Sequence, residues 1–150
     1  MTIDEFVTTA EEIINTIQNT YNNYIKTINK YIDDLENILN SGTKYSNEYK
    51  NRKLKEINGK IQKAADSANR VIESKKQDIN EWYKSQAKTI IENTVKNTLS
   101  KVGTPPIGEV LETAINAIPI PELPMPDLKI TISEIKIKDF ESSNISLPRL

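Results

Sequence analysis

The sequence predicts a mainly α-helical protein built on a long antiparallel helical hairpin of coiled-coil type. Two observations predict the hairpin: an apolar heptad runs unbroken through the first 40 residues, and a second long stretch without proline follows a short Asn-Ser-Gly break. A third observation predicts a different ending, because four prolines between residues 119 and 126 precede a run of alternating apolar and polar residues. We therefore expect a helical hairpin over residues 1–102 and a tail over residues 103–150. The tail would hold a short helix, a Pro-rich extended arm and one C-terminal β-strand or minimal hairpin.

The first helix is indicated by apolar or aromatic residues in alternating steps of three and four. Such spacing over more than four heptads is typical of a coiled coil or a helical bundle. Further apolar residues widen the stripe on both sides, which favours a bundle of three or more helices over an isolated pair. Thr2 or Asp4 can cap the start, and Gly42 suits a left-handed end. The heptad positions are Val7, Ala10, Ile14, Ile17, Tyr21, Tyr24, Ile28, Tyr31, Leu35 and Ile38.

The second helix is predicted over about residues 45–101, where the sequence has no proline. Its apolar stripe is interrupted by the polar run 73–78. The resulting eleven-residue spacing is a stutter, which unwinds a coiled coil locally without breaking the helix. A sharp bend at this run is the alternative, and it would allow a compact three-helix bundle.

Charge and side-chain size favour antiparallel pairing of the two helices. Residues 1–40 have seven acids and two bases, a net charge of −5, whereas residues 41–101 have fourteen bases and seven acids, a net charge of +7. A reversal near residues 40–44 places Tyr24 opposite Ile61 and Tyr21 opposite Ala64, so large side chains meet small ones.

The second helix is longer than the first, and its last 20 residues overhang by about 28 Å at the usual helical rise. Either the tail folds back over this overhang, or another copy or another protein covers it. Trp82 and Tyr83 lie where the first helix should end, and they are either a plug for the hairpin core or an interface anchor. The overhang residues that we expect to bind a partner are Trp82, Tyr83, Ile90, Ile91, Val95 and Leu99.

The tail begins with a short amphipathic helix from Ile107 to Ile118. The prolines that follow exclude a central strand and favour an extended, partly polyproline II segment. Residues 128–138 then alternate in the pattern of a β-strand, with a one-residue slip at Ser133 and Glu134. A lone strand needs partners for its backbone, so we expect pairing between subunits, addition to a partner's sheet, or a minimal hairpin. The expected partner-binding residues here are Ile120, Leu123, Met125, Ile130, Ile132, Ile135 and Ile137.

Composition argues against chemistry at a site. The chain has no His and no Cys, which removes the commonest general base, the commonest metal ligand and every thiolate site. The acidic cluster of Asp33, Asp34 and Glu36 has no calcium-loop spacing, so we interpret it as a solvated helix face. We expect no enzyme activity, no cofactor, no metal and no small-molecule substrate. The basic residues between 50 and 63 are diluted by acids, so nucleic acid is not an expected partner.

The function class that fits best is a non-enzymatic structural protein. We expect an assembly subunit of a larger oligomer, of the kind found in a virion, phage tail, baseplate or injection machine, that binds other protein subunits and copies of itself. The alternative is a small signal-free secreted or chaperone-like helical-hairpin adaptor that binds another helical protein. The acidic start lacks a signal peptide, and no stretch is apolar for long enough to span a membrane, so we expect synthesis in the cytoplasm.

Overall fold

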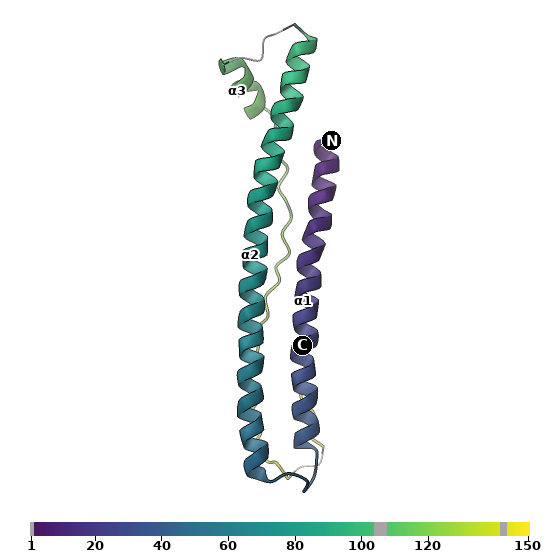
Figure 1. Cartoon of the computed structure of the whole chain (residues 1–150), viewed down its shortest axis with the longest axis vertical. Coiled ribbons are helices and arrows are strands. Elements are labelled where there is room, and N and C mark those ends of the chain that lie inside the picture. The colour runs from purple at the N-terminus through teal and green to yellow at the C-terminus, as the bar shows by residue number, and fades with distance from the viewer. Residues whose placement is uncertain (1, 104–107, 142–143) are drawn as a thin grey trace. The chain divides into compact units, whose positions relative to one another are not determined.

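The protein is mainly helical, and the prediction of a helical fold is confirmed. The structure, a computed structural model, describes residues 2–103, 108–141 and 144–150. It contains three helices: α1 (Ile3–Leu39), α2 (Asn47–Lys101) and α3 (Gly108–Asn116) (Figure 1). α3 corresponds to the short helix predicted in the tail, whose expected first residue, Ile107, lies outside the described ranges. None of the helices in these ranges is long and apolar enough to cross a bilayer.

The chain divides into two compact units, and each unit combines helices with part of the tail. The first unit comprises Met1–Ile17 and Ser74–Pro126, and the second comprises Gln18–Glu73 and Asp127–Leu150. α2 is continuous from Asn47 to Lys101, so the polar run 73–78 is a stutter within one helix and not a bend that ends it. Each unit is described by itself below.

The helix ends follow from local sequence. The backbone N–H of Glu5 donates to the Thr2 hydroxyl at 3.1 Å, and the N–H of Thr2 donates to the Glu5 carboxylate at 3.3 Å. This reciprocal pair is a capping box, so Thr2 and not Asp4 caps α1. α1 ends at Leu39, and Gly42 follows with a φ of 64°, a left-handed conformation that favours glycine. The Ser46 hydroxyl then caps α2 by accepting from the N–H of Tyr49.

The core of the second unit has three layers of chain. α1 and α2 lie side by side there, and residues 127–141 and 144–150 run over them as extended chain (Figure 1). The tyrosines of the α1 heptad are only half-buried, and the aliphatic residues carry the core. The broad apolar stripe predicted to meet a third helix is instead covered by this extended segment. The buried members of the cluster are Ile28, Ile32, Leu35, Leu39, Leu54, Ile57, Ile61, Ala65, Ala68, Ile130 and Leu147.

The core of the first unit is smaller and centres on aromatic rings. The rings of Phe6 and Tyr83 are stacked, with centroids 5.3 Å apart. Trp82 tilts against Phe6 at 5.2 Å, and Trp82 itself stays 38% exposed. Ala10, Ile14, Ala87 and Leu123 complete the buried cluster.

The predicted β-strand over residues 128–138 is not shown by the structure. These residues are extended, but no part of the described chain forms a strand. Alternation of apolar and polar residues correctly indicates an extended backbone with one buried face, because successive side chains then point to opposite sides. It does not indicate which groups satisfy that backbone, and in this protein those groups are side chains on the helices.

Candidate functional site

Four asparagines in the second unit hold the extended tail by its backbone. Each side-chain amide donates to the carbonyl oxygen of one tail residue and accepts from the N–H of the same residue. Asn58 binds Ile135 in this way at 2.8 and 3.0 Å, and Asn69 binds Ile130 at 2.9 and 2.8 Å. On α1, Asn40 binds Ile145 at 2.8 Å in both bonds, and Asn29 binds Leu150 at 3.2 and 2.9 Å. We call these four residues the asparagine ladder.

The ladder is in register with an extended chain. Asn29 and Asn40 are eleven residues apart, as are Asn58 and Asn69. Eleven residues return to the same helix face and rise by about 16.5 Å. The two tail residues held on each helix are five apart, and five extended residues also span about 16.5 Å. The match lets one straight helix hold two points of an extended chain without bending either.

The tail follows each helix in turn and runs antiparallel to it. Residues 127–141, here the α2 leg, pass Asn69 before Asn58, and residues 144–150, the α1 leg, pass Asn40 before Asn29. At the end of the α2 leg, the buried ammonium of Lys50 donates to the carbonyl oxygens of Gly42 at 2.9 Å and Phe140 at 3.2 Å. A lysine is rarely buried unless acceptors such as these carbonyl oxygens bind its ammonium group.

Charged groups add to the hold on the α1 leg. Glu36 accepts from the backbone N–H of Leu147 at 2.9 Å, and the Arg149 guanidinium forms ion pairs with Asp33 at 2.7 Å and Glu36 at 3.2 Å. The Leu147 N–H and next the Arg149 side chain hold the pKa of the Glu36 carboxyl below its ordinary value. The interpretation of Asp33 and Glu36 as part of a purely solvated face is therefore wrong.

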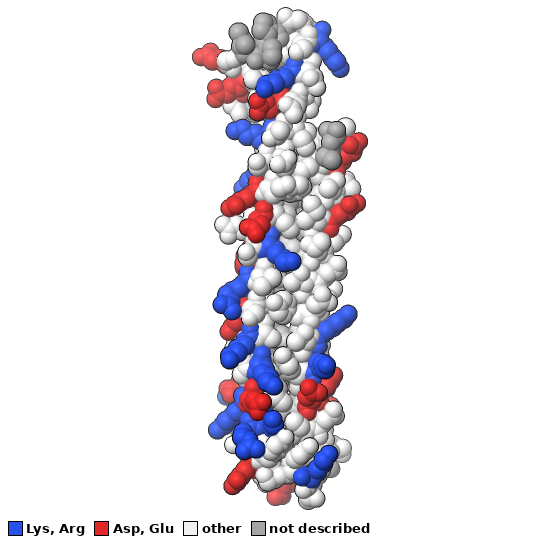
Figure 2. Space-filling view, viewed as in Figure 1, with Lys and Arg blue, Asp and Glu red and all other residues white. Residues whose placement is uncertain are grey.

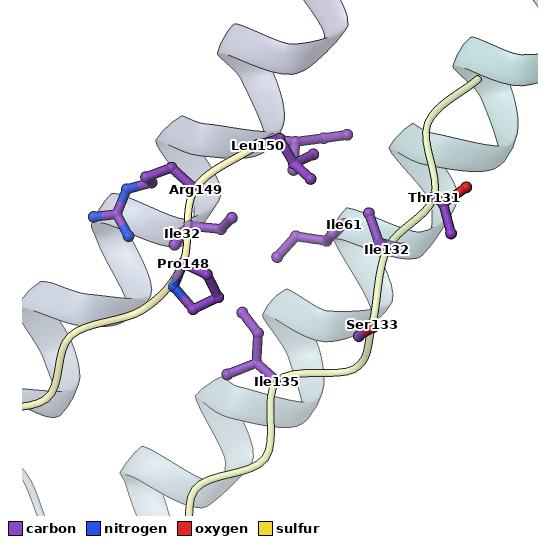
Figure 3. Close-up of a pocket in the computed structure, with 10 residues that line it drawn as sticks. Ile32, Ile61, Thr131, Ile132, Ser133, Ile135, Pro148, Arg149 and Leu150 are labelled. Carbon is purple, nitrogen blue, oxygen red and sulfur yellow. The ribbon is translucent and has the colours of Figure 1, made fainter. Parts of the chain in front are cut away.

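A pocket of about 220 Å³ lies between the two legs (Figure 3). Its walls are mostly aliphatic, and the labelled side chains of Ile61, Ile132 and Ile135 surround the open space (Figure 3). The α1 leg contributes Pro148, Arg149 and Leu150 to the opposite wall. The two legs thus do not pack tightly against each other at this point.

Most tail residues predicted to bind a partner pack within this chain. In the second unit, Ile130 is buried, and Ile132, Ile135 and Ile137 pack half-buried against the same core. In the first unit, Leu123 is buried and Met125 packs beside it, whereas Ile120 stays 42% exposed. The structure therefore brings these residues together as two groups, one in each unit. Whether any of them also meets another chain stays a prediction.

The predicted residues of α2 also differ in placement. Tyr83 is buried, and its hydroxyl donates to the carbonyl oxygen of Pro121 at 2.6 Å. Burial, and next the Glu11 carboxylate, raise the pKa of this phenol, so it stays protonated as a donor. Ile91 and Val95 are buried, while Ile90 and Leu99 are half-buried. A partner role for these residues, with Trp82, likewise stays a prediction.

The basic residues of α2 show no built site for an anion. Lys and Arg gather over the α2 side of the second unit (Figure 2). Lys53 and Lys60 form ion pairs with Glu56 at 3.2 and 3.6 Å, and the hydrogen bond from Lys53 lowers the pKa of Glu56. These exposed ion pairs neutralise part of the positive charge at this point of α2.

The asparagine ladder was missed from the sequence. Asparagine is common in this chain, and a half-buried asparagine beside an apolar stripe is unremarkable by itself. The available signal is the repeated spacing of eleven on both helices, set against aliphatic residues five apart in the tail. That signal depends on knowing which tail residues face which helix.

Comparison with known proteins identifies a family. A family model described as YgjP-like, metallopeptidase domain, matches residues 1–111. The match covers most of the chain, so the chain belongs to this family. No curated protein and no solved structure matches the chain.

The family contradicts the function expected from the sequence. A metallopeptidase family points to peptidase chemistry, so the prediction of a non-enzymatic assembly subunit of a virion, phage tail or injection machine is wrong. The expectation that the chain is not an enzyme, and the adaptor alternative, are contradicted by the same match. The composition was misleading here because residue counts indicate whether common catalytic residues are present and do not indicate family membership.

The side chains of this member do not fit a catalytic zinc site of the usual kind. Such a site takes three protein ligands, most often including His, and leaves one position open. The sequence has no His and no Cys, and no cluster of three or more acidic ligands occurs among the residues that the structure describes. The residues that the structure describes therefore do not fit a catalytic zinc ion of this kind.

Proposed function

We propose that this member of the YgjP-like metallopeptidase family performs the polypeptide-binding step of peptidase function, by holding a chain extended on the asparagine ladder of the second unit. A peptidase must present the backbone of its substrate in an ordered, exposed conformation before a peptide bond can react. Recognition of an extended chain through its backbone groups, with pockets for alternate side chains, is an established mode of peptide binding. The ladder supplies the backbone part of such a mode.

The single observation that carries the proposal is the paired bond of each asparagine with one tail residue. Each pair uses only the N–H and C=O that every residue except proline possesses, so the ladder reads backbone and not side chain. All four asparagines are half-buried, and the bonds of Asn40, Asn58 and Asn69 are themselves part-buried, where water screens them less. The protein's own tail shows the geometry in which an extended polypeptide is held.

Side-chain contacts add selectivity to this backbone hold. The tail residues at the four ladder positions are Ile130, Ile135, Ile145 and Leu150, all aliphatic. Ile130 is 4% exposed, and Ile135 and Ile145 pack against the same core. A polypeptide with aliphatic residues five apart therefore satisfies both the ladder and the apolar surface beside it.

The test is binding of a labelled peptide copying residues 127–140 to the full-length chain. Ile130→Asp and Ile135→Asp together displace the protein's own α2 leg, and circular dichroism checks that the helices persist. A matched peptide carries N-methyl groups at the positions of Ile130 and Ile135, which removes two backbone donors and keeps every side chain. We expect the plain peptide to bind at least about tenfold more tightly than the methylated one.

Two results would contradict the proposal. Equal binding of the plain and methylated peptides would show that the ladder does not read the backbone. Undiminished binding to a chain that also carries Asn58→Ala and Asn69→Ala would place the peptide elsewhere. Mass spectrometry of the same samples, with and without added Zn²⁺, reports whether the bound peptide is also cleaved.

A further inference from the structure

The α1 leg is held less firmly by apolar packing than the α2 leg. Of the α1 leg, only Leu147 is buried and Ile145 is half-buried, whereas Leu150 is 46% exposed. The α2 leg has Ile130 buried, three further isoleucines half-buried in the core, and Lys50 bonded to Phe140 at its end. Loss of the α1 leg therefore exposes less apolar surface than loss of the α2 leg.

The pocket between the legs indicates that one leg can leave its helix while the other stays bound. Its volume of about 220 Å³ is open space lined by Ile132 and Ile135 of the α2 leg and by Pro148 and Leu150 of the α1 leg, so the legs leave a gap between them there. The α1 leg can leave without pulling the α2 leg from its own ladder positions, Asn58 and Asn69. Departure of the α1 leg leaves an apolar surface that includes Ile28, Ile32 and Ile61.

The vacated surface has a defined chemistry. Asn29 and Asn40 present paired donors and acceptors for two backbone positions five residues apart. The core position that Leu147 fills requires an aliphatic side chain. Asp33 and Glu36 lose the guanidinium that matches their charge, so they favour a cationic side chain in its place.

We infer that the surface of α1 around Asn29 and Asn40, here the α1 face, is an exchangeable binding site for an extended polypeptide segment. The segment that fits has aliphatic residues at its first, third and sixth positions and a basic residue at its fifth. This inference depends on the proposed function and names the class of polypeptide and the part of the ladder that receives it. The α1 leg is the seated template of that segment, with Ile145, Leu147 and Leu150 as the aliphatic residues and Arg149 as the base. The α2 leg stays in place and forms the opposite wall.

The test uses full-length protein and a labelled heptapeptide copying residues 144–150, Asn-Ile-Ser-Leu-Pro-Arg-Leu. Arg149→Glu places a carboxylate against Asp33 and Glu36, which repels the protein's own leg without changing either helix. We expect this variant to bind the heptapeptide at least about tenfold more tightly than the unmodified protein does. A heptapeptide with Glu in place of Arg should not bind it.

A reciprocal charge reversal supplies the matched control. A chain with Asp33→Arg and Glu36→Arg repels its own Arg149, and it should bind the Glu heptapeptide in preference to the Arg heptapeptide. Nuclear magnetic resonance of the asparagine side-chain amides locates the peptide, with shifts expected at Asn29 and Asn40 and not at Asn58 and Asn69.

The outcomes separate this inference from the proposed function. If both heptapeptides bind equally, or if the shifts fall on Asn58 and Asn69, the inference is overturned while backbone reading by the α2 face can still stand. If the plain and N-methylated peptides of the preceding test bind equally, the proposed function fails, whichever heptapeptide binds. If no heptapeptide binds either repelled variant, the α1 face is not an exchangeable site.

Discussion

Residues 119–126 form one extended stretch against helices, and residues 127–141 and 144–150 form a second, yet different groups hold the two stretches. The first stretch is rich in proline, and it is held by Leu123 and Met125 in an apolar cluster and by the Tyr83 hydroxyl, which donates to the Pro121 carbonyl. The second stretch is held by asparagines that bind an N–H and a C=O together. Proline has no N–H, so a paired bond is impossible at a proline and a donor-only partner suffices.

This difference shows that the amino-acid composition of the tail decides which helix side chains can bond its backbone. A tyrosine hydroxyl satisfies a lone carbonyl, whereas the carboxamide of asparagine satisfies both backbone polar groups of one residue, its N–H and its C=O. Within the second unit the two legs differ again, because the α1 leg adds charged partners that the α2 leg lacks, apart from Lys50 at its end. These contrasts lead to three predictions.

Removing the buried anchor of the α2 leg should have the largest effect. Ile130→Ala deletes methyl groups from the core of the second unit, and such truncations cost about 2–5 kcal/mol of unfolding free energy. Ile120→Ala, at a 42% exposed position in the Pro-rich stretch, should change stability by less than about 0.5 kcal/mol. Urea denaturation of the two variants measures both, and similar costs would contradict the packing described.

Removing one rung of the ladder should have an intermediate effect confined to the tail. Asn58→Ala leaves the N–H and C=O of Ile135 without their side-chain partner. The free energy that holds this part of the tail in place should fall by about 1–3 kcal/mol. Hydrogen exchange at the Ile135 amide should accelerate accordingly. The control is Asn51→Ala, an exposed asparagine on the same helix, which should leave tail exchange unchanged. Unchanged exchange at Ile135 in Asn58→Ala would show that the ladder is not what orders the tail.

Acid should loosen the α1 leg and spare the α2 leg. The pKa of Glu36 is lowered in the folded protein from its ordinary value of 4.5, so its stabilising contribution is complete above that pH and is lost as pH falls through the lowered pKa. Protonation of Glu36 also removes one of the two carboxylates that pair with Arg149. Exchange at Leu147 should rise in acid relative to Ile135, after correction for intrinsic rates, and Glu36→Gln should flatten that rise. Parallel loosening of both legs would argue against charged partners on the α1 leg alone.

Some of the site could be predicted from the sequence, and some could not. The alternation in residues 128–138 indicated extended chain with a buried face, and Ile130, Ile132, Ile135 and Ile137 do pack on that face. The expected strand is not shown among the described residues, because alternation describes side chains and leaves backbone partners open. Asn58 and Asn69 were not singled out, because nothing local to an asparagine distinguishes a solvated amide from one that binds a distant peptide unit.

Local propensity and periodicity predicted the three helices, a cap at Thr2 or Asp4, the glycine turn at Gly42 and the extended course of the tail. The structure shows Thr2 as the cap, and packing of the folded chain laid the tail over the broad apolar face of the helices and brought asparagines to hold it. The bonds of Asn40 to Ile145 and of Asn69 to Ile130 join residues far apart in the chain, and such partners exist only after the helices and tail are packed together. The physical reason is that backbone groups must be satisfied when buried, but the chain can meet that demand in many ways, and packing selects one of them.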